Sequence, residues 1–119
     1  MLEYFVVLLM MFQFKHWYID FVDQTDAEVK GKGIYGNWQG IKHSLKHATA
    51  TFIAVLSLIF DIDYLGFALI IATLDFVTHY HIDWCKMNYG NRDIKTPQFW
   101  HHLGLDQMAH QMVYIILAY

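Results

Sequence analysis

Pairs of metal-ligating residues recur at a spacing of four along this sequence. Residues four apart on an α-helix lie on the same face, one turn from each other. Four segments carry such a pair or run, and each contains histidine. They are His16 with Asp20, His43 with His47, Asp75 with His79 and Asp83, and Asp106 with His110. Imidazole together with carboxylate suits zinc, iron, manganese or nickel, so the spacing predicts a metal site shared between helices.

The predicted ligands fall at two depths when turns are counted from the expected helix ends. An inner ring contains histidines and an outer ring contains three aspartates, one turn nearer the ends. Asp75 lies a turn deeper, alone. The ligands that we expect are His16, Asp20, His47, His79, Asp83, Asp106 and His110, with His43 and Asp75 as further candidates. A divalent metal is expected, zinc first and iron or manganese next; a hydrogen-bonded network without metal is the alternative.

Several neighbouring residues have predicted supporting roles. Asp83 and Asp106 are the expected catalytic residues, as ligands or as general base. Gln107 follows Asp106 and is expected to orient a ligand, and Lys86 lies three residues after Asp83, where an ion pair with it is expected. We expect the three other histidines to lie outside the site. His81 would face another side of its helix, and His101 and His102 would lie in or near a loop.

The elements that must position these residues are half apolar and half polar. The apolar halves are residues 4–12, 48–60, 64–74 and 112–119. The apolar half comes first in segments one and three and last in segments two and four. An up-down four-helix bundle would therefore gather all apolar halves at one end and the His/Asp cluster at the other. We expect one all-α domain, residues 1–119, with loops at 22–39 and 88–100 and a tight turn at 61–63.

The composition predicts that this bundle lies in a membrane. Hydrophobic residues make up 56% of the 119 residues and charged residues 16%, against about 25% charged in an ordinary domain. Residues 6–11 are apolar on every side, as in a helix surrounded by lipid or deeply buried. A chain this short cannot surround four such helices with its own protein. The expected environment is membrane lipid, and a soluble oligomer with a shared core is the alternative.

Charge placement predicts the orientation. All eight lysines and arginines fall at the polar end or in its loops, and such residues mark the cytoplasmic side. We therefore expect a multi-pass protein of the inner (cytoplasmic) membrane, with both termini outside and the polar site facing the cytoplasm. The formal net charge of −3 provides no basic field for nucleic acid. A homo-oligomer is compatible with the exposed apolar ends.

Combined motifs in the four segments resemble a family of small, uncharacterised multi-pass membrane proteins of bacteria and phages. The matching motifs are His-x-x-x-Asp-Phe at residues 16–21, His-x-x-x-Asp-x-x-Lys at 79–86 and Asp-Gln-x-x-His at 106–110. The family pattern also has one histidine in the second helix, which corresponds to His47 or to His43. The resemblance implies a helical His/Asp constellation in a membrane and implies no established activity.

Three functions remain open on the sequence. The first is a metal-dependent hydrolase of a lipid or phosphoester, in which a divalent ion generates hydroxide near neutral pH. The second is a small effector, such as a phage protein that binds a host membrane partner, with the cluster serving as structure. The third is a metal or proton transporter, which would need a polar path through the apolar ends.

Overall fold

The chain is almost entirely helical. The computed structural model describes residues 1–59 and 61–119, and no strand occurs in that part of the chain. The elements are α1 (Leu2–Trp17), a π-helical turn η1 (Tyr18–Val22), α2 (Asp26–Lys32), α3 (Trp38–Ile59), a 3₁₀ turn η2 (Ile62–Tyr64), α4 (Leu65–Tyr89) and α5 (Pro97–Ala118). The prediction of an all-α chain is confirmed. The predicted apolar half 48–60 ends on Phe60, which lies outside the described residues.

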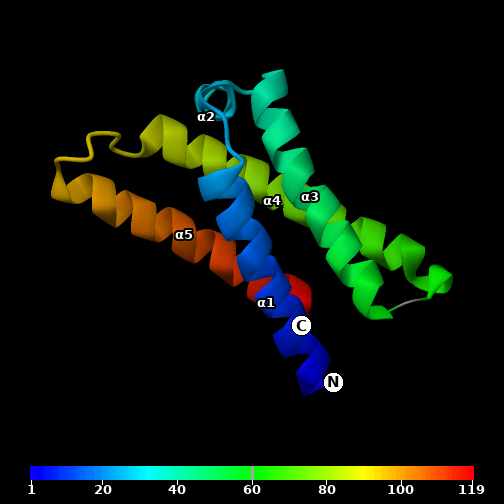
Figure 1. Ribbon diagram of the computed structural model, residues 1–119. Helices are drawn as coiled ribbons and strands as arrows, with labels where there is room; N and C mark the ends of the chain where they lie inside the picture. Colours follow the sequence, from blue (N-terminus) through cyan, green and yellow to red (C-terminus); the bar gives the residue numbers. More distant parts are fainter. Residues whose placement is uncertain (60) are drawn as a thin grey trace.

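The four long helices pack in a closed order. α1 contacts α3 and α5, α3 contacts α4, and α4 contacts α5, while the short α2 lies against α3 and α4. Consecutive long helices run in opposite directions, and the two chain ends lie near each other (Figure 1). At that end the rings of Phe5 and Tyr119 meet edge to face, 6.5 Å apart. This packing brings every polar half of a long helix towards the same region.

Helix α2 corrects the expectation of a loop over residues 22–39. Thr25 and Glu28 form a capping box, in which the Thr25 hydroxyl accepts from the Glu28 backbone N–H at 3.2 Å and the Glu28 carboxylate accepts from the Thr25 backbone N–H at 3.0 Å. Such a box satisfies two backbone donors at a helix start. A Cβ on Gly40 would lie 2.9 Å from the Gly31 carbonyl oxygen. The glycines that suggested a loop instead allow α2 to approach α3 closely.

The start of α5 is a second correction. His101 and His102 are helical, because α5 begins at Pro97. The Thr96 hydroxyl accepts from the Phe99 backbone N–H at 3.3 Å, and proline suits the first helical position, whose N–H has no partner within the helix. The helix therefore starts inside the segment 88–100, which was expected to be a loop.

The apolar halves form a small core and a large apolar exterior. Side chains buried between the long helices are Phe12, Ala54, Val55, Ala68, Ile71, Tyr114 and Leu117. Around them, Met10, Ile70 and Ile116 are between 59% and 71% exposed. Two stretches, Leu2–Val22 and Ile62–Tyr89, are long and apolar enough to cross a membrane. This is weak evidence of membrane association, because core helices and signal sequences can have the same length and composition.

Candidate metal centre

The polar halves enclose the predicted ligands almost completely. His43, His47, His79 and His110 are at most 1% exposed, and Asp20 is 9% exposed. Three groups of side chains each offer ligand atoms within 4.8 Å of one another: Asp20, His43, His47 and His79; His16, His79 and His110; and Asp83, Asp106 and His110. Every long helix or its extension contributes. The predicted inner and outer rings are thus in contact and form one cluster.

Asp20 is the centre of the first group. Its Oδ1 lies 2.8 Å from His43 Nε2, 2.9 Å from His47 Nε2 and 3.7 Å from His79 Nε2. In a tetrahedral zinc site with bonds near 2.0–2.1 Å, neighbouring ligand atoms lie about 3.3 Å apart. The observed distances bracket that value. Asp20 belongs to the π-helical turn η1, a distortion common at functional sites because it redirects a side chain.

The second carboxylate group has similar spacing. His110 Nε2 lies 3.3 Å from Asp83 Oδ1 and 3.5 Å from Asp106 Oδ1. Asp83 Oδ2 lies 3.3 Å from His79 Nε2. His79 therefore stands between the Asp20 group and the Asp83 group, and its ring stacks on His47 with centroids 3.6 Å apart.

Several buried atoms of this cluster have no hydrogen-bond partner among the described residues. They are Nδ1 of His43, both ring nitrogens of His79, Oδ2 of Asp83, Nε2 of His110 and Oδ1 of Asp106. Most buried polar groups in proteins do have a partner, and a buried polar group left without one is costly. Three of them, His79 Nε2, His110 Nε2 and Asp106 Oδ1, lie 3.3–3.5 Å from another candidate ligand atom, the spacing expected of side chains that share a bound cation.

Two lysines that the sequence analysis missed, Lys15 and Lys32, lie beside these carboxylates. Lys32 Nζ, from α2, lies 2.9 Å from Asp83 Oδ2 and 3.9 Å from Asp20 Oδ1. The cluster and the adjoining Lys15–Asp75 pair contain four buried carboxylates and three lysines paired with them, so one negative charge remains when the histidines are counted as neutral. Those carboxylates are Asp20, Asp75, Asp83 and Asp106, and the lysines are Lys15, Lys32 and Lys86. The Thr25-x-x-Glu28 signature was the signal that could have identified α2 and therefore Lys32.

Asp75 has partners, contrary to the expectation that it stands alone. Lys15 Nζ lies 2.7 Å from Asp75 Oδ2, and the Thr51 hydroxyl donates to the same oxygen at 2.6 Å. Lys15 also lies 3.4 Å from Nδ1 of His47. Asp75 belongs to none of the three ligand groups. The contacts place it in a separate buried ion pair next to the cluster.

Both ring nitrogens of His16 have hydrogen-bond partners, as do both ring nitrogens of His47. Nδ1 of His16 is hydrogen-bonded to the Tyr114 hydroxyl and Nε2 to Gln107 Oε1, each at 2.9 Å. Gln107 also donates to Asp106 Oδ2 at 3.0 Å. Gln107 therefore touches two predicted ligands, as a residue that orients them would. One of the two His16 bonds would have to be broken before His16 could ligate a metal.

Lys86 pairs with a different aspartate from the one expected. Its Nζ lies 3.0 Å from Asp106 Oδ2 on α5, so the ion pair joins two helices instead of bridging to Asp83 along α4. His81 lies outside the three ligand groups. Its Nε2 is hydrogen-bonded to the Tyr35 hydroxyl at 3.0 Å.

Glu28 anchors α2 from the other side. Its buried carboxylate lies 2.7 Å from Lys46 Nζ and also accepts from the Thr25 backbone N–H. Burial acts to raise the pKa of Glu28, but the Lys46 ammonium and the Thr25 hydrogen bond outweigh it and hold the pKa below its usual value. The ionised carboxylate therefore fixes the helix that delivers Lys32.

Comparison with known proteins gives a family and no activity. The family model described as "Protein of unknown function (DUF3307)" matches residues 7–119. No curated protein and no solved structure matches the chain. The expected resemblance to a family without assigned activity is confirmed, and its bacterial or phage source and membrane nature stay predictions.

Proposed function

Because the chain belongs to the DUF3307 family, whose description assigns no activity, we propose its function from the site: a membrane protein whose His/Asp cluster binds a divalent metal ion and hydrolyses a lipid or phosphoester. The observation that carries the proposal is the set of partnerless ligand atoms on His79, His110 and Asp106. Counted with neutral histidines, the cluster keeps one negative charge, which favours a cation as the partner of these atoms.

The donor set favours zinc, with iron or manganese next. Asp20 with His43, His47 and His79 offers three imidazoles and one carboxylate, and no thiolate lies among them. A divalent ion would supply Lewis-acid chemistry here, lowering the pKa of a water so that hydroxide forms near neutral pH. Asp83 and Asp106 are the residues that we expect to hold the ion or accept the proton.

Hydrolysis at this site would consume one water. Its oxygen would bond to the phosphorus or acyl carbon of the ester as the bond to the leaving oxygen breaks. One proton of the water would pass to a carboxylate and then to that leaving oxygen. Asp106 suits the transfer because its Oδ1 has no hydrogen-bond partner among the described residues.

The membrane placement is supported by the exposed apolar exterior and the two candidate spans. We propose that all four long helices cross the inner membrane, with the termini outside and the polar end cytoplasmic, because the eight lysines and arginines lie at or near that end. Membrane lipid is then the neighbouring substrate pool. Transport has less support, because the described interior beyond Asp75 is the apolar core around Phe12 and Val55.

Elemental analysis of the detergent-purified chain tests the proposal. We expect one or two equivalents of zinc, iron or manganese in the wild type, and loss of the metal in His79→Ala and in His110→Ala. The exposed helical His101 provides the control His101→Ala, which should retain the metal. Absence of metal from wild type purified without chelator would overturn the proposal and favour an effector with a structural polar network.

Asp83→Asn tests the hydrolytic role separately. If the wild-type protein holds metal and hydrolyses lipid phosphoesters, Asp83→Asn should lose this activity while remaining folded. Unchanged hydrolysis in Asp83→Asn would remove that residue from the reaction.

A further inference from the structure

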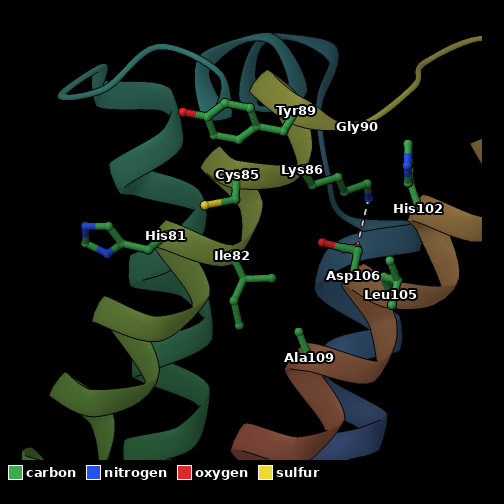
Figure 2. A pocket seen from close by; sticks show the side chains of 10 residues that line it. All are labelled: His81, Ile82, Cys85, Lys86, Tyr89, Gly90, His102, Leu105, Asp106 and Ala109. Carbon is green, nitrogen blue, oxygen red and sulfur yellow. Dashed lines mark hydrogen bonds and ion pairs between the residues drawn. The ribbon is translucent and has the colours of Figure 1, made fainter.

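A groove lies between α4 and α5 on the outer side of the His/Asp cluster. It has a volume of about 490 Å³ and is lined from α4 by Ile82, Cys85 and Lys86 and from α5 by His102, Leu105 and Asp106, among others. Figure 2 shows Lys86 reaching from α4 towards Asp106 on α5. The wall of the groove therefore includes a predicted metal ligand.

Lys86 provides a cation on the inner wall. Its side chain is 33% exposed, and its ammonium lies 3.0 Å from Asp106 Oδ2. An ammonium has three donors, and Asp106 is the single acceptor bonded to Lys86 in the described part of the chain. The remaining donors are available to an anion in the groove. Asp106 Oδ1 lies 3.5 Å from His110 Nε2, so such an anion would sit one side chain away from the cluster.

His102 provides a second donor. The Asn91 backbone N–H donates to His102 Nδ1 at 2.8 Å, so a neutral ring carries its proton on Nε2. His81 also lines the groove, but its Nδ1 is bonded to the Val77 carbonyl oxygen at 2.7 Å and its Nε2 to Tyr35. Tyr89 also lines the groove, but its hydroxyl points away from Lys86 and Asp106 (Figure 2). Lys86 and His102 are therefore the donors that a phosphate group beside Asp106 would use.

The rest of the groove is apolar and continues onto an apolar surface. Ile82, Leu105 and Ala109 line it, and on α5 Leu105 is 46% and Met108 55% exposed. A water-soluble phosphoester would leave these side chains uncovered, whereas an acyl chain would cover them. The groove has cationic and polar donors at one end and apolar side chains along the rest. This combination favours a molecule with an anionic group and an apolar chain.

We propose that this groove binds an anionic phospholipid, with the phosphate at Lys86 and His102 and an acyl chain along Ile82, Leu105 and Ala109. This inference rests on the proposed function, for which it names the substrate class and its route to the cluster. Lys86 binds the headgroup, and Asp106 separates that headgroup from His79 and His110.

Cys85 provides a direct probe, because it is the single cysteine of the chain, is exposed and lines the groove. The experiment measures the rate of maleimide alkylation of the full chain in detergent during titration with dioleoyl phosphatidic acid. Parallel titrations use dioleoyl phosphatidylcholine and inorganic phosphate. We expect phosphatidic acid alone to slow alkylation.

Variants identify the binding residues. Lys86→Ala should raise the half-protecting concentration of phosphatidic acid by about tenfold, the loss expected when a charge-assisted contact is removed. Ala109→Phe, which fills the apolar part, should also reduce protection. Lys95→Ala removes the same charge from the exposed loop and should behave as wild type.

Three results would overturn the inference: equal protection by phosphatidylcholine, protection by inorganic phosphate alone, or full protection in Lys86→Ala. Metal content measured on the same samples separates the two proposals. Protection by lipid in samples without metal would overturn the hydrolase proposal and leave the lipid site in place. Bound metal without protection by lipid would overturn the lipid site and leave the hydrolase proposal in place.

Discussion

The polar and apolar halves of the four long helices differ in which side chains they bury and which they expose. In the polar half, histidines, aspartates and lysines point inwards, and His43 and His47 are fully buried. In the apolar half, a core that includes Phe12, Val55 and Tyr114 is surrounded by exposed Met10 and Ile116. The charged groups are inside and much of the apolar surface is outside, the reverse of a water-soluble helical bundle.

This difference shows which interactions each half depends on. In the proposed membrane placement, lipid would cover the exposed apolar side chains of the apolar half. The polar half depends on charge compensation in its interior. The Lys15–Asp75 pair lies at the border between the halves, next to His47 on one side and to the Phe12 and Tyr114 rings on the other.

The largest expected effect comes from breaking that border pair. Lys15→Met leaves the Asp75 carboxylate buried without its cation and should lower the free energy of unfolding by about 3–5 kcal/mol. Adding Asp75→Leu should recover most of the loss, because a buried ion pair can often be replaced by apolar side chains at little cost. Chemical denaturation in detergent measures both variants.

A matched control for this pair is Lys30→Met, which removes a lysine that is exposed on α2. It should leave the stability close to that of wild type. A double variant as unstable as Lys15→Met alone would show that the pair is not the source of the effect.

The next largest effect should come from metal removal, which should destabilise the polar half more than the apolar half. If the cluster holds an ion at a hundred times its dissociation constant, chelation should lower the stability by about 2.7 kcal/mol. Amide exchange should rise first around residues 16–20 and 106–110, with the apolar half around Val55 and Ile71 still protected. His101→Ala should respond as wild type, whereas His79→Ala should already be insensitive to chelator. Equal loss of protection in both halves would contradict the division.

A smaller effect is expected at the cap of α2. Thr25→Ala removes the hydroxyl that accepts from the Glu28 backbone N–H and should cost about 1 kcal/mol. Because α2 carries Lys32, amide exchange should rise locally in Asp26–Lys32 before it rises elsewhere. The control Thr73→Ala alters an exposed threonine within α4 and should change stability by only a few tenths of a kcal/mol. Unchanged amide exchange of α2 in Thr25→Ala would show that packing alone stabilises this helix.

The smallest effect should be a pH dependence confined to α2. The pKa of Glu28 is lowered in the folded chain, so its stabilising contribution is complete above the usual carboxyl range and is lost as the pH falls through the lowered value. Amide exchange of α2, corrected for the intrinsic effect of pH, should increase in that acidic window. Glu28→Gln should remove this dependence, and a profile identical to wild type would assign it to another group, such as Asp23 paired with Lys46.

The sequence predicted the long helices and much of the cluster because both depend on local geometry. A spacing of four places His79 and Asp83 on one face of α4 whatever packs against it. It did not predict α2, because the glycines around it outweighed the capping box at Thr25 and Glu28. It also missed Lys32, whose role depends on that helix, and it gave Asp75 no partner.

What the sequence determined by itself is which residues share a helix face and which ends of the helices are polar, since backbone hydrogen bonds between near neighbours fix that periodicity. Only the tertiary structure decided which faces meet. Lys15 reaches Asp75 across 60 residues of chain, Lys86 joins Asp106 instead of Asp83, and His43 enters the cluster through Asp20. Such contacts follow from the packing of whole helices. Within the described residues, the same packing leaves atoms of His79, His110 and Asp106 without a hydrogen-bond partner.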